Sequence, residues 1–144
     1  MIEIPPWYKI ALGEIGVKEA PGPNQANPRI LEYLRAVAIH TTSDEIPWCA
    51  AFVNWCLQQA HITGTHSAAA RSFMNWGEVL KAPKVGCIAI LKRGTGWQGH
   101  VAFYEGQKAG GRVILYGGNQ KDEVRSSNYP VDDVLGYRFP GKKK

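Results

Sequence analysis

Apolar residues recur at helical spacing through the first half of the chain, and the segments that carry them have helix start or stop signals. Proline stands in the first turn of the first two segments, and Gly77 closes the last. We therefore expect helices from Pro6 to Gly16 or the following APGPN stretch, from Asn27 to about Ala38, from Pro47 to about Ala60, and from Ala68 to Trp76.

The third of these segments, PWCAAFVNWCL, is the most informative. Its apolar side chains form one stripe, so the helix must press that stripe against another apolar surface. The stripe consists of Cys49, Phe52, Val53, Cys56 and Ala60. Cys49 therefore stands at the beginning of a helix that packs against the core.

After Pro83 the pattern changes to short runs rich in β-branched and aromatic residues, separated by turns that contain glycine. The runs are GCIAILKRG, HVAFYEG, RVILYGG and VLGYRF. Such a series is typical of an antiparallel meander. The fold class expected is α+β, with an N-terminal helical half packed on a C-terminal antiparallel sheet. At 144 residues we expect one domain over residues 1–144.

The net charge of +5 changes this picture little, because Lys142, Lys143 and Lys144 supply three of those charges as a basic tail. The rest of the chain has no basic stripe with interleaved aromatics, so we expect no nucleic-acid partner. The tail is either a solvated end or a contact with an anionic cell envelope.

No run of 18 apolar residues occurs, and the first residues lack the basic start and cleavage site of a signal peptide. We therefore expect that the protein is made in the cytoplasm and does not insert stably into a membrane. The three cysteines are expected to be free thiols. Cys49 and Cys56 lie seven residues apart on one helix, a rise of roughly 10 Å that is too long for a disulfide.

Cys49 and His100 suggest nucleophilic catalysis. A thiol at a helix N-terminus ionises more readily because the helix dipole and free N–H groups stabilise the thiolate. His100 begins the run HVAFYEG and can accept the thiol proton, while Asn119 in LYGGNQ can orient the imidazole. A zinc site built from Cys49, Cys56, Cys87 and His100 is the alternative, although the spacing of these residues does not match zinc motifs.

Seven motifs, in order, resemble the phage and bacterial branch of the NlpC-type and CHAP cysteine peptidase superfamily. They are PWYKIALGEIGVKE, NPRILEYL, DEIPWCAAFVNWCL, ARSFMNWG, GHVAFYEG, GGNQ and LGYRFPG, and they extend from Pro6 to about Gly141. The resemblance implies a papain-like core, with Cys49 as nucleophile, His100 as base and Asn119 as the third residue. Gln120 is the adjacent competitor for that third position. The chain departs from the family at Gly86-Cys87, where relatives usually have Gly-Asp.

The resemblance also implies a function: cleavage of an amide bond in bacterial peptidoglycan, as in many phage endolysins. We expect no cofactor, a monomer, and action on the cell wall after release by another route. Trp48, Trp97 and Gln120 are expected to contact the substrate, and an ion site at Asp44 and Glu45 is a further alternative. A non-catalytic wall-binding or tail-associated module, or an intracellular cysteine amidase or protease, are the competing functions.

Overall fold

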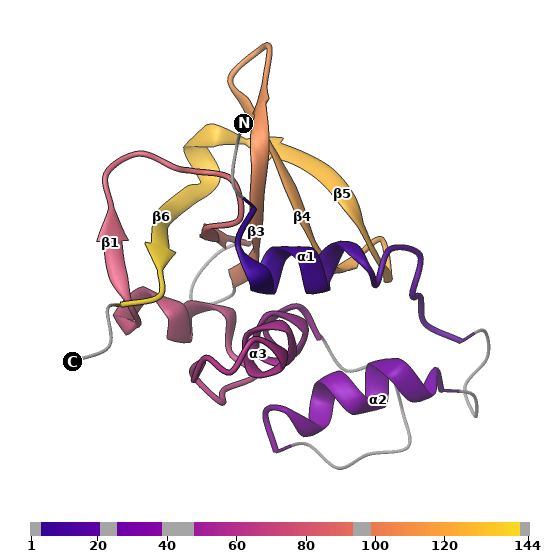
Figure 1. Cartoon of the computed structure of the whole chain (residues 1–144). Coiled ribbons are helices and arrows are strands. Elements are labelled where there is room, and N and C mark those ends of the chain that lie inside the picture. Colours follow the sequence, from indigo (N-terminus) through magenta and orange to yellow (C-terminus); the bar gives the residue numbers. More distant parts are fainter. Residues whose placement is uncertain (1–3, 21–25, 39–47, 94–98, 142–144) are drawn as a thin grey trace.

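The structure of the chain is a computed structural model that describes residues 4–20, 26–38, 48–93 and 99–141. It is an α+β fold, as the sequence predicts (Figure 1). The helices are α1 (Pro6–Leu12), α2 (Pro28–Arg35), α3 (Cys49–Gln59) and the 3-10 helices η1 (Ala70–Asn75) and η2 (Val131–Asp133). The strands are β1 (Glu78–Leu80), β2 (Ile88–Lys92), β3 (Gly99–Lys108), β4 (Arg112–Gln120), β5 (Glu123–Pro130) and β6 (Val134–Phe139).

The four helical segments predicted from the sequence all exist, with corrections to their ends and types. Asn27 caps α2 by accepting a hydrogen bond from the Arg29 N–H at 2.9 Å, which is why this helix begins at the Asn-Pro pair. α1 ends at Leu12, earlier than predicted, and the N–H of Gly13 at its C-cap still donates to the carbonyls of Lys9 and Ile10. The last predicted helix, from Ala68 to Trp76, forms the 3-10 helix η1 rather than an α-helix.

The prediction of a single apolar stripe on α3 was wrong, because every residue from Cys49 to Leu57 is buried. α3 contacts α1, α2, β3 and β4, so it lies in the interior with other elements on several sides. Figure 1 shows the three α-helices gathered on one side of the sheet. No helix in the described part of the chain is long and apolar enough to span a bilayer.

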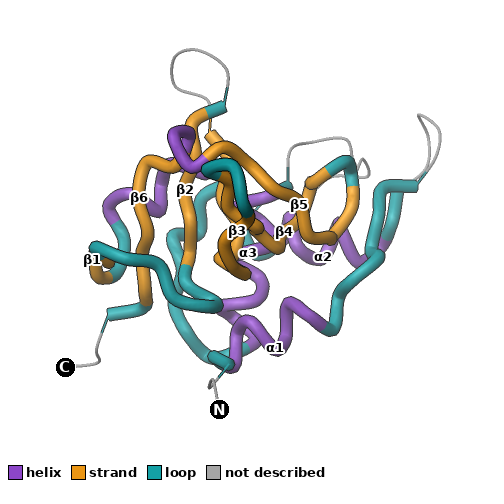
Figure 2. Tube along the Cα trace, turned by 90° about the horizontal axis from the view of Figure 1, so that it is seen from above, coloured by secondary structure: helices purple, strands orange, loops and turns teal. Residues whose placement is uncertain are grey.

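The six strands form one antiparallel sheet in the order β1-β6-β2-β3-β4-β5 (Figure 2). β2, β3 and β4 form the first part of the predicted meander, but the expected fourth run, β6, pairs with β2 and β1 rather than with β4, and β5 lies beside β4 instead. The sequence pattern missed β1 and β5. β5 has the polar sequence EVRSSNYP, so its extended conformation depends on pairing with β4 at the edge of the sheet.

Alternation along the strands divides the core into two clusters. Ile88, Ile90, Val101 and Phe103 face the helices, whereas Cys87, Ala89, Leu91 and Ala102 face the opposite side. His100 is the register partner of Leu91 and lies one residue before Val101. The strand period of two therefore places His100 on the face opposite Val101, at the beginning of β3.

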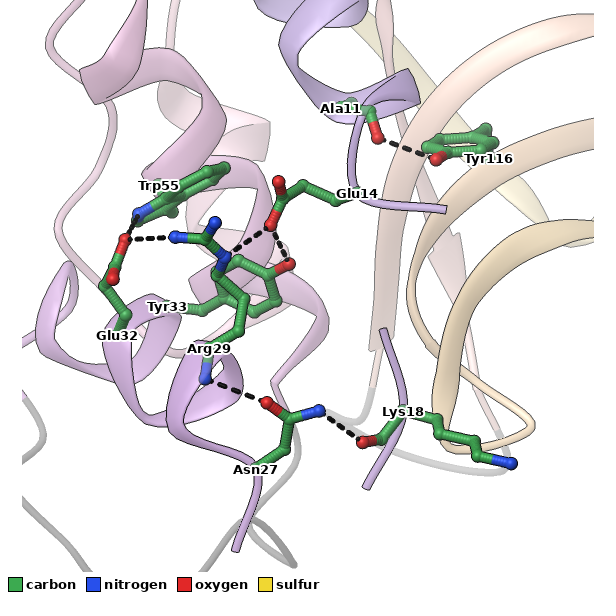
Figure 3. Close-up of polar contacts among 9 residues, drawn as sticks. All are labelled: Ala11, Glu14, Lys18, Asn27, Arg29, Glu32, Tyr33, Trp55 and Tyr116. Carbon is green, nitrogen blue, oxygen red and sulfur yellow. Dashed lines mark hydrogen bonds and ion pairs between the residues drawn. The ribbon is translucent and has the colours of Figure 1, made fainter. Parts of the chain in front are cut away.

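A polar network joins the three α-helices (Figure 3). Glu14, just after α1, forms an ion pair with Arg29 Nε at 3.0 Å and accepts a hydrogen bond from Tyr33 Oη at 2.6 Å. The Trp55 indole N–H donates to Glu32 at 2.9 Å, and Arg29 pairs with the same carboxylate at 3.1 Å. These contacts hold α2 against α3, which carries Cys49 at its first residue.

Candidate active site

Cys49 is the first residue of α3 and lies against the beginning of β3. Trp48 precedes it at the N-cap without a side-chain capping bond, so the first-turn N–H groups remain for other acceptors. Two backbone N–H groups, those of Ala50 and Val101, donate toward the Cys49 thiol. The thiol is thus held between the helix and the strand that carries His100, with the residue 4% exposed.

Several opposing effects act on the pKa of Cys49. Burial alone raises the pKa, because it disfavours the charged thiolate. The interaction with His100, as hydrogen-bonding partner and as charge, and the two backbone N–H groups lower it, and together they outweigh burial. The net result is a pKa below the usual value for cysteine, which favours the nucleophilic form.

The other two cysteines lack this environment. All three are free thiols, as the sequence predicts. Burial raises the pKa of Cys56 well above its usual value, and the negative charge of Glu14 raises it further. Burial also raises the pKa of Cys87, to about 11. Only Cys49 therefore has the surroundings of a reactive thiol.

His100 is held by Gln120, the last residue of β4. The His100 Nε2 atom lies 2.9 Å from Gln120 Oε1, and both side chains are buried. The Gln120 amide nitrogen donates to the carbonyls of Leu115, at 3.1 Å, and Arg125, at 2.6 Å. Because both amide hydrogens have acceptors, Oε1 is the atom left to accept a hydrogen bond from the imidazole.

This orientation of the amide decides the tautomer of the neutral imidazole. Nε2 carries the hydrogen that Gln120 accepts, so Nδ1 carries the lone pair. Nδ1 of His100 is buried without a hydrogen bond of ordinary geometry. A buried polar atom left without such a bond is unusual in a folded protein and is common where a group takes part in chemistry. Nδ1 is thus free to interact with the Cys49 thiol.

Tyr129 on β5 completes the polar cluster. Its hydroxyl donates to Gln120 Oε1 at 3.0 Å and lies 3.4 Å from His100 Nε2. The Tyr129 and His100 rings are 5.5 Å apart between centroids, so the ring also covers one side of the imidazole. No sequence pattern indicated this residue, because β5 has no alternating apolar pattern.

Asn119, the residue predicted to orient His100, occupies a different place. Its backbone is left-handed, with φ of 58°, at a register shift between Gly117 and Gln120 in the β4–β5 pair. Within the described residues no hydrogen bond joins its side chain to His100, whereas Gln120 makes that bond. Asn tolerates a left-handed backbone better than most residues, so Asn119 permits the shift that directs Gln120 toward His100.

The remaining predicted site residues have varied positions. Trp48 is fully buried, stacks on Tyr33 at 5.9 Å and donates its indole N–H to Glu19 at 3.0 Å. It is a core side chain and offers no face to a substrate, which corrects the expectation from the sequence. Trp97, Asp44 and Glu45 lie outside the described residues.

The described residues hold no group of three or more His, Cys, Asp or Glu side chains arranged to bind a metal ion. Cys56 belongs to the core cluster on the helix side, and Cys87 to the cluster on the opposite face of the sheet. The four candidate zinc ligands considered from the sequence are therefore not brought together. The chemistry that this arrangement supports is that of a thiolate with a histidine partner.

Comparison with known families gives a match between the CHAP domain and residues 41–119, just over half of the chain. The matched range contains Cys49, His100 and Asn119 and ends one residue before Gln120. No match was found among curated proteins or among solved structures.

Proposed function

The chain belongs to the CHAP domain family, whose general activity is peptidoglycan hydrolysis of the amidase type, and we propose that it cleaves a cell-wall amide bond through the Cys49 thiolate. The observation that carries the proposal is the arrangement of Cys49, His100 and Gln120. The pKa of the thiol is lowered, and the imidazole is held in the tautomer that leaves Nδ1 available.

In the proposed mechanism, the thiol proton is transferred to Nδ1 of His100, giving a thiolate and an imidazolium. The thiolate attacks the amide carbonyl, and His100 gives its proton to the nitrogen of the leaving amine as the C–N bond breaks. Water then attacks the thioester while His100 accepts its proton. The products are an amine, a carboxylate and the regenerated thiol.

The negative oxygen that forms during attack needs hydrogen-bond donors. The Cys49 backbone N–H is at the first position of α3, where no intrahelical acceptor exists. None of the hydrogen bonds among the described residues uses this N–H, so we propose it as one donor. Removing a donor of this kind typically reduces kcat on the order of 100-fold or more.

The biological setting is part of the proposal. The motifs that resemble phage and bacterial relatives favour an endolysin that is made in the cytoplasm and reaches the wall by another route. A non-catalytic wall-binding module is less consistent with a thiol of lowered pKa beside an oriented imidazole. An intracellular amidase or protease would use the same chemistry, so the substrate has to be identified by experiment.

The test is digestion of purified peptidoglycan, with mass spectrometry of the released fragments. The wild-type protein should release fragments whose new ends identify the cleaved bond as muramoyl-alanine or peptide. Cys49→Ala and His100→Ala should each abolish release while circular dichroism remains normal, and the double variant should be no worse than either. Cys87→Ala serves as the control and should retain most activity. Full release by a folded Cys49→Ala protein would overturn the thiol mechanism.

A further inference from the structure

A small cleft lies beside His100. Its volume is about 180 Å³, and its lining residues are Leu91, Lys92, Arg93, His100, Tyr129 and Asp133. Leu91 and the Tyr129 ring give it apolar walls, while Lys92, Arg93 and Asp133 bring charges. No step of the proposed mechanism uses these three charged residues.

The chemistry of the proposed function indicates which part of a substrate would reach this cleft. His100 gives a proton to the nitrogen of the leaving amine, so that nitrogen must come within hydrogen-bonding distance of the imidazole. The part of the substrate attached to it therefore passes on the histidine side of Cys49. The cleft is lined by His100, which makes it the candidate position for this part of the substrate.

The charges of the cleft do not cancel. Lys92 Nζ lies 4.0 Å from Asp133 Oδ1, and both side chains are substantially exposed. Arg93 forms no ion pair with another described residue, so the lining carries one positive charge in excess. Burial raises the pKa of Tyr129 to about 12, and the positive charge of Arg93 opposes that rise. The field of Arg93 thus reaches the hydroxyl that contacts Gln120.

We propose that the cleft is a subsite for the leaving part of the substrate and that it binds a free carboxylate there through Arg93 and Lys92. A guanidinium matches the planar geometry of a carboxylate, and the apolar walls suit the carbon atoms next to it. The proposal rests on the proposed function and deepens it. It implies a preference for peptides whose leaving fragment is acidic over the same peptides in amidated form.

One experiment tests the subsite without any wall substrate. Cys49 is alkylated by iodoacetate, which carries a carboxylate, and by neutral iodoacetamide, and the ratio of the two rates is measured. Arg93→Gln should lower the iodoacetate-to-iodoacetamide ratio by about two- to fivefold, the effect of one exposed ion pair. Arg93→Lys should retain most of the ratio, because the charge remains.

Lys108→Gln is the matched control, since it removes the same unit of charge. Lys108 is exposed at the far end of β3, roughly 26 Å from His100 along the strand. The iodoacetate-to-iodoacetamide ratio of the Lys108→Gln variant should equal that of the wild type. Equal ratios in Arg93→Gln and Lys108→Gln would overturn the subsite, because the preference for iodoacetate would then come from net charge or from the imidazolium alone.

A second experiment uses a pair of synthetic wall peptides that differ only in a free carboxylate or a carboxamide on the leaving fragment. The wild type should have a lower KM for the free acid, and Arg93→Gln should reduce the difference in KM about two- to fivefold. Equal KM values in the wild type would overturn the proposal. If neither peptide nor whole peptidoglycan is cleaved, the proposed function fails, while the alkylation ratio still decides whether the cleft binds anions.

Discussion

The reactivity of individual residues in this protein depends on their surroundings more than on their type. Cys49, Cys56 and Cys87 are all buried, and burial by itself raises the pKa of each thiol. Only at Cys49 do an imidazole and two backbone N–H groups reverse that effect. A thiolate is therefore stabilised at one position, at the start of a helix.

Alkylation should follow this difference. At neutral pH iodoacetamide should modify Cys49 rapidly in the native protein. The lowered pKa of Cys49 keeps its thiolate populated at pH values below the usual cysteine pKa of about 8.5. Cys56 and Cys87 should react only after unfolding in urea. Peptide mass spectrometry of native and unfolded samples measures the three sites separately. Labelling of Cys56 or Cys87 as fast as Cys49 would contradict the assignment.

Substitutions at the neighbouring residues Asn119 and Gln120 should have different effects, because only Gln120 bonds to His100. Gln120→Ala removes the acceptor for His100 Nε2, so kcat should fall on the order of tenfold, which is the value of one lost hydrogen bond. Asn119→Ala should leave kcat close to wild type but lower stability by about 1–2 kcal/mol, because alanine is strained at a φ of 58°.

Measurements of kcat and of thermal unfolding distinguish the two effects. Asn119→Gly should keep both the rate and the stability of the wild type, since glycine adopts the left-handed backbone conformation without strain. A larger loss of rate in Asn119→Ala than in Gln120→Ala would return the orienting role to Asn119.

At the scale of elements, the site depends on close contact between α3 and β4. A Cβ atom at Gly118 would lie 2.6 Å from Trp48 Cζ3 and 2.8 Å from Phe52 Cβ. Both neighbours are fully buried, so they have little room to move. The glycine lets the strand that carries Gln120 approach the helix that carries Cys49.

Gly118→Ala should therefore separate the two elements. We expect the free energy of unfolding to fall by about 1–3 kcal/mol, as for other overpacked core sites, and alkylation of Cys49 to slow. Gly106→Ala is the matched control, because no atom lies within 4 Å of the position of its Cβ. Denaturant unfolding and alkylation rates measure both effects. Equal stability of the two variants would show that Trp48 and Phe52 move to accommodate the new Cβ atom without loss of folding free energy.

At the scale of the whole molecule, we expect the net positive charge to affect how the protein approaches an anionic surface. Lys142 to Lys144 contribute three of the five net positive charges, and deleting them leaves +2. Attraction between exposed charges is screened beyond roughly 8 Å at physiological ionic strength. We therefore expect the tail to assist contact with an anionic envelope more strongly at low salt than at high salt.

Deletion of residues 142–144 should weaken binding to permeabilised cells at low salt, and the difference from the full chain should disappear at high salt. Hydrolysis of soluble wall fragments should keep its rate, because the proposed mechanism uses no residue of the tail. Sedimentation of protein with cells across a salt series measures binding. Identical binding at low salt would show that the tail is passive, and slower hydrolysis of soluble fragments would show that it affects the fold or the site.

The sequence by itself determined the features that depend on local patterns. Helical spacing and the Asn27-Pro28 pair predicted where α2 begins, and the apolar segment after Pro47 placed Cys49 at the start of α3. Alternation after Gly99 placed His100 at the beginning of β3, opposite Val101. These features follow from side-chain periodicity and capping, which act over a few neighbouring residues.

Only the tertiary structure decided which side chains meet. β5 became a strand through pairing with β4, since its own residues are polar, and it brought Tyr129 to the site. The register shift near Asn119 turned Gln120, rather than Asn119, toward His100. In a strand, a shift of one residue exchanges the faces on which side chains lie. Such a shift arises from pairing between strands, so local pattern cannot reveal it.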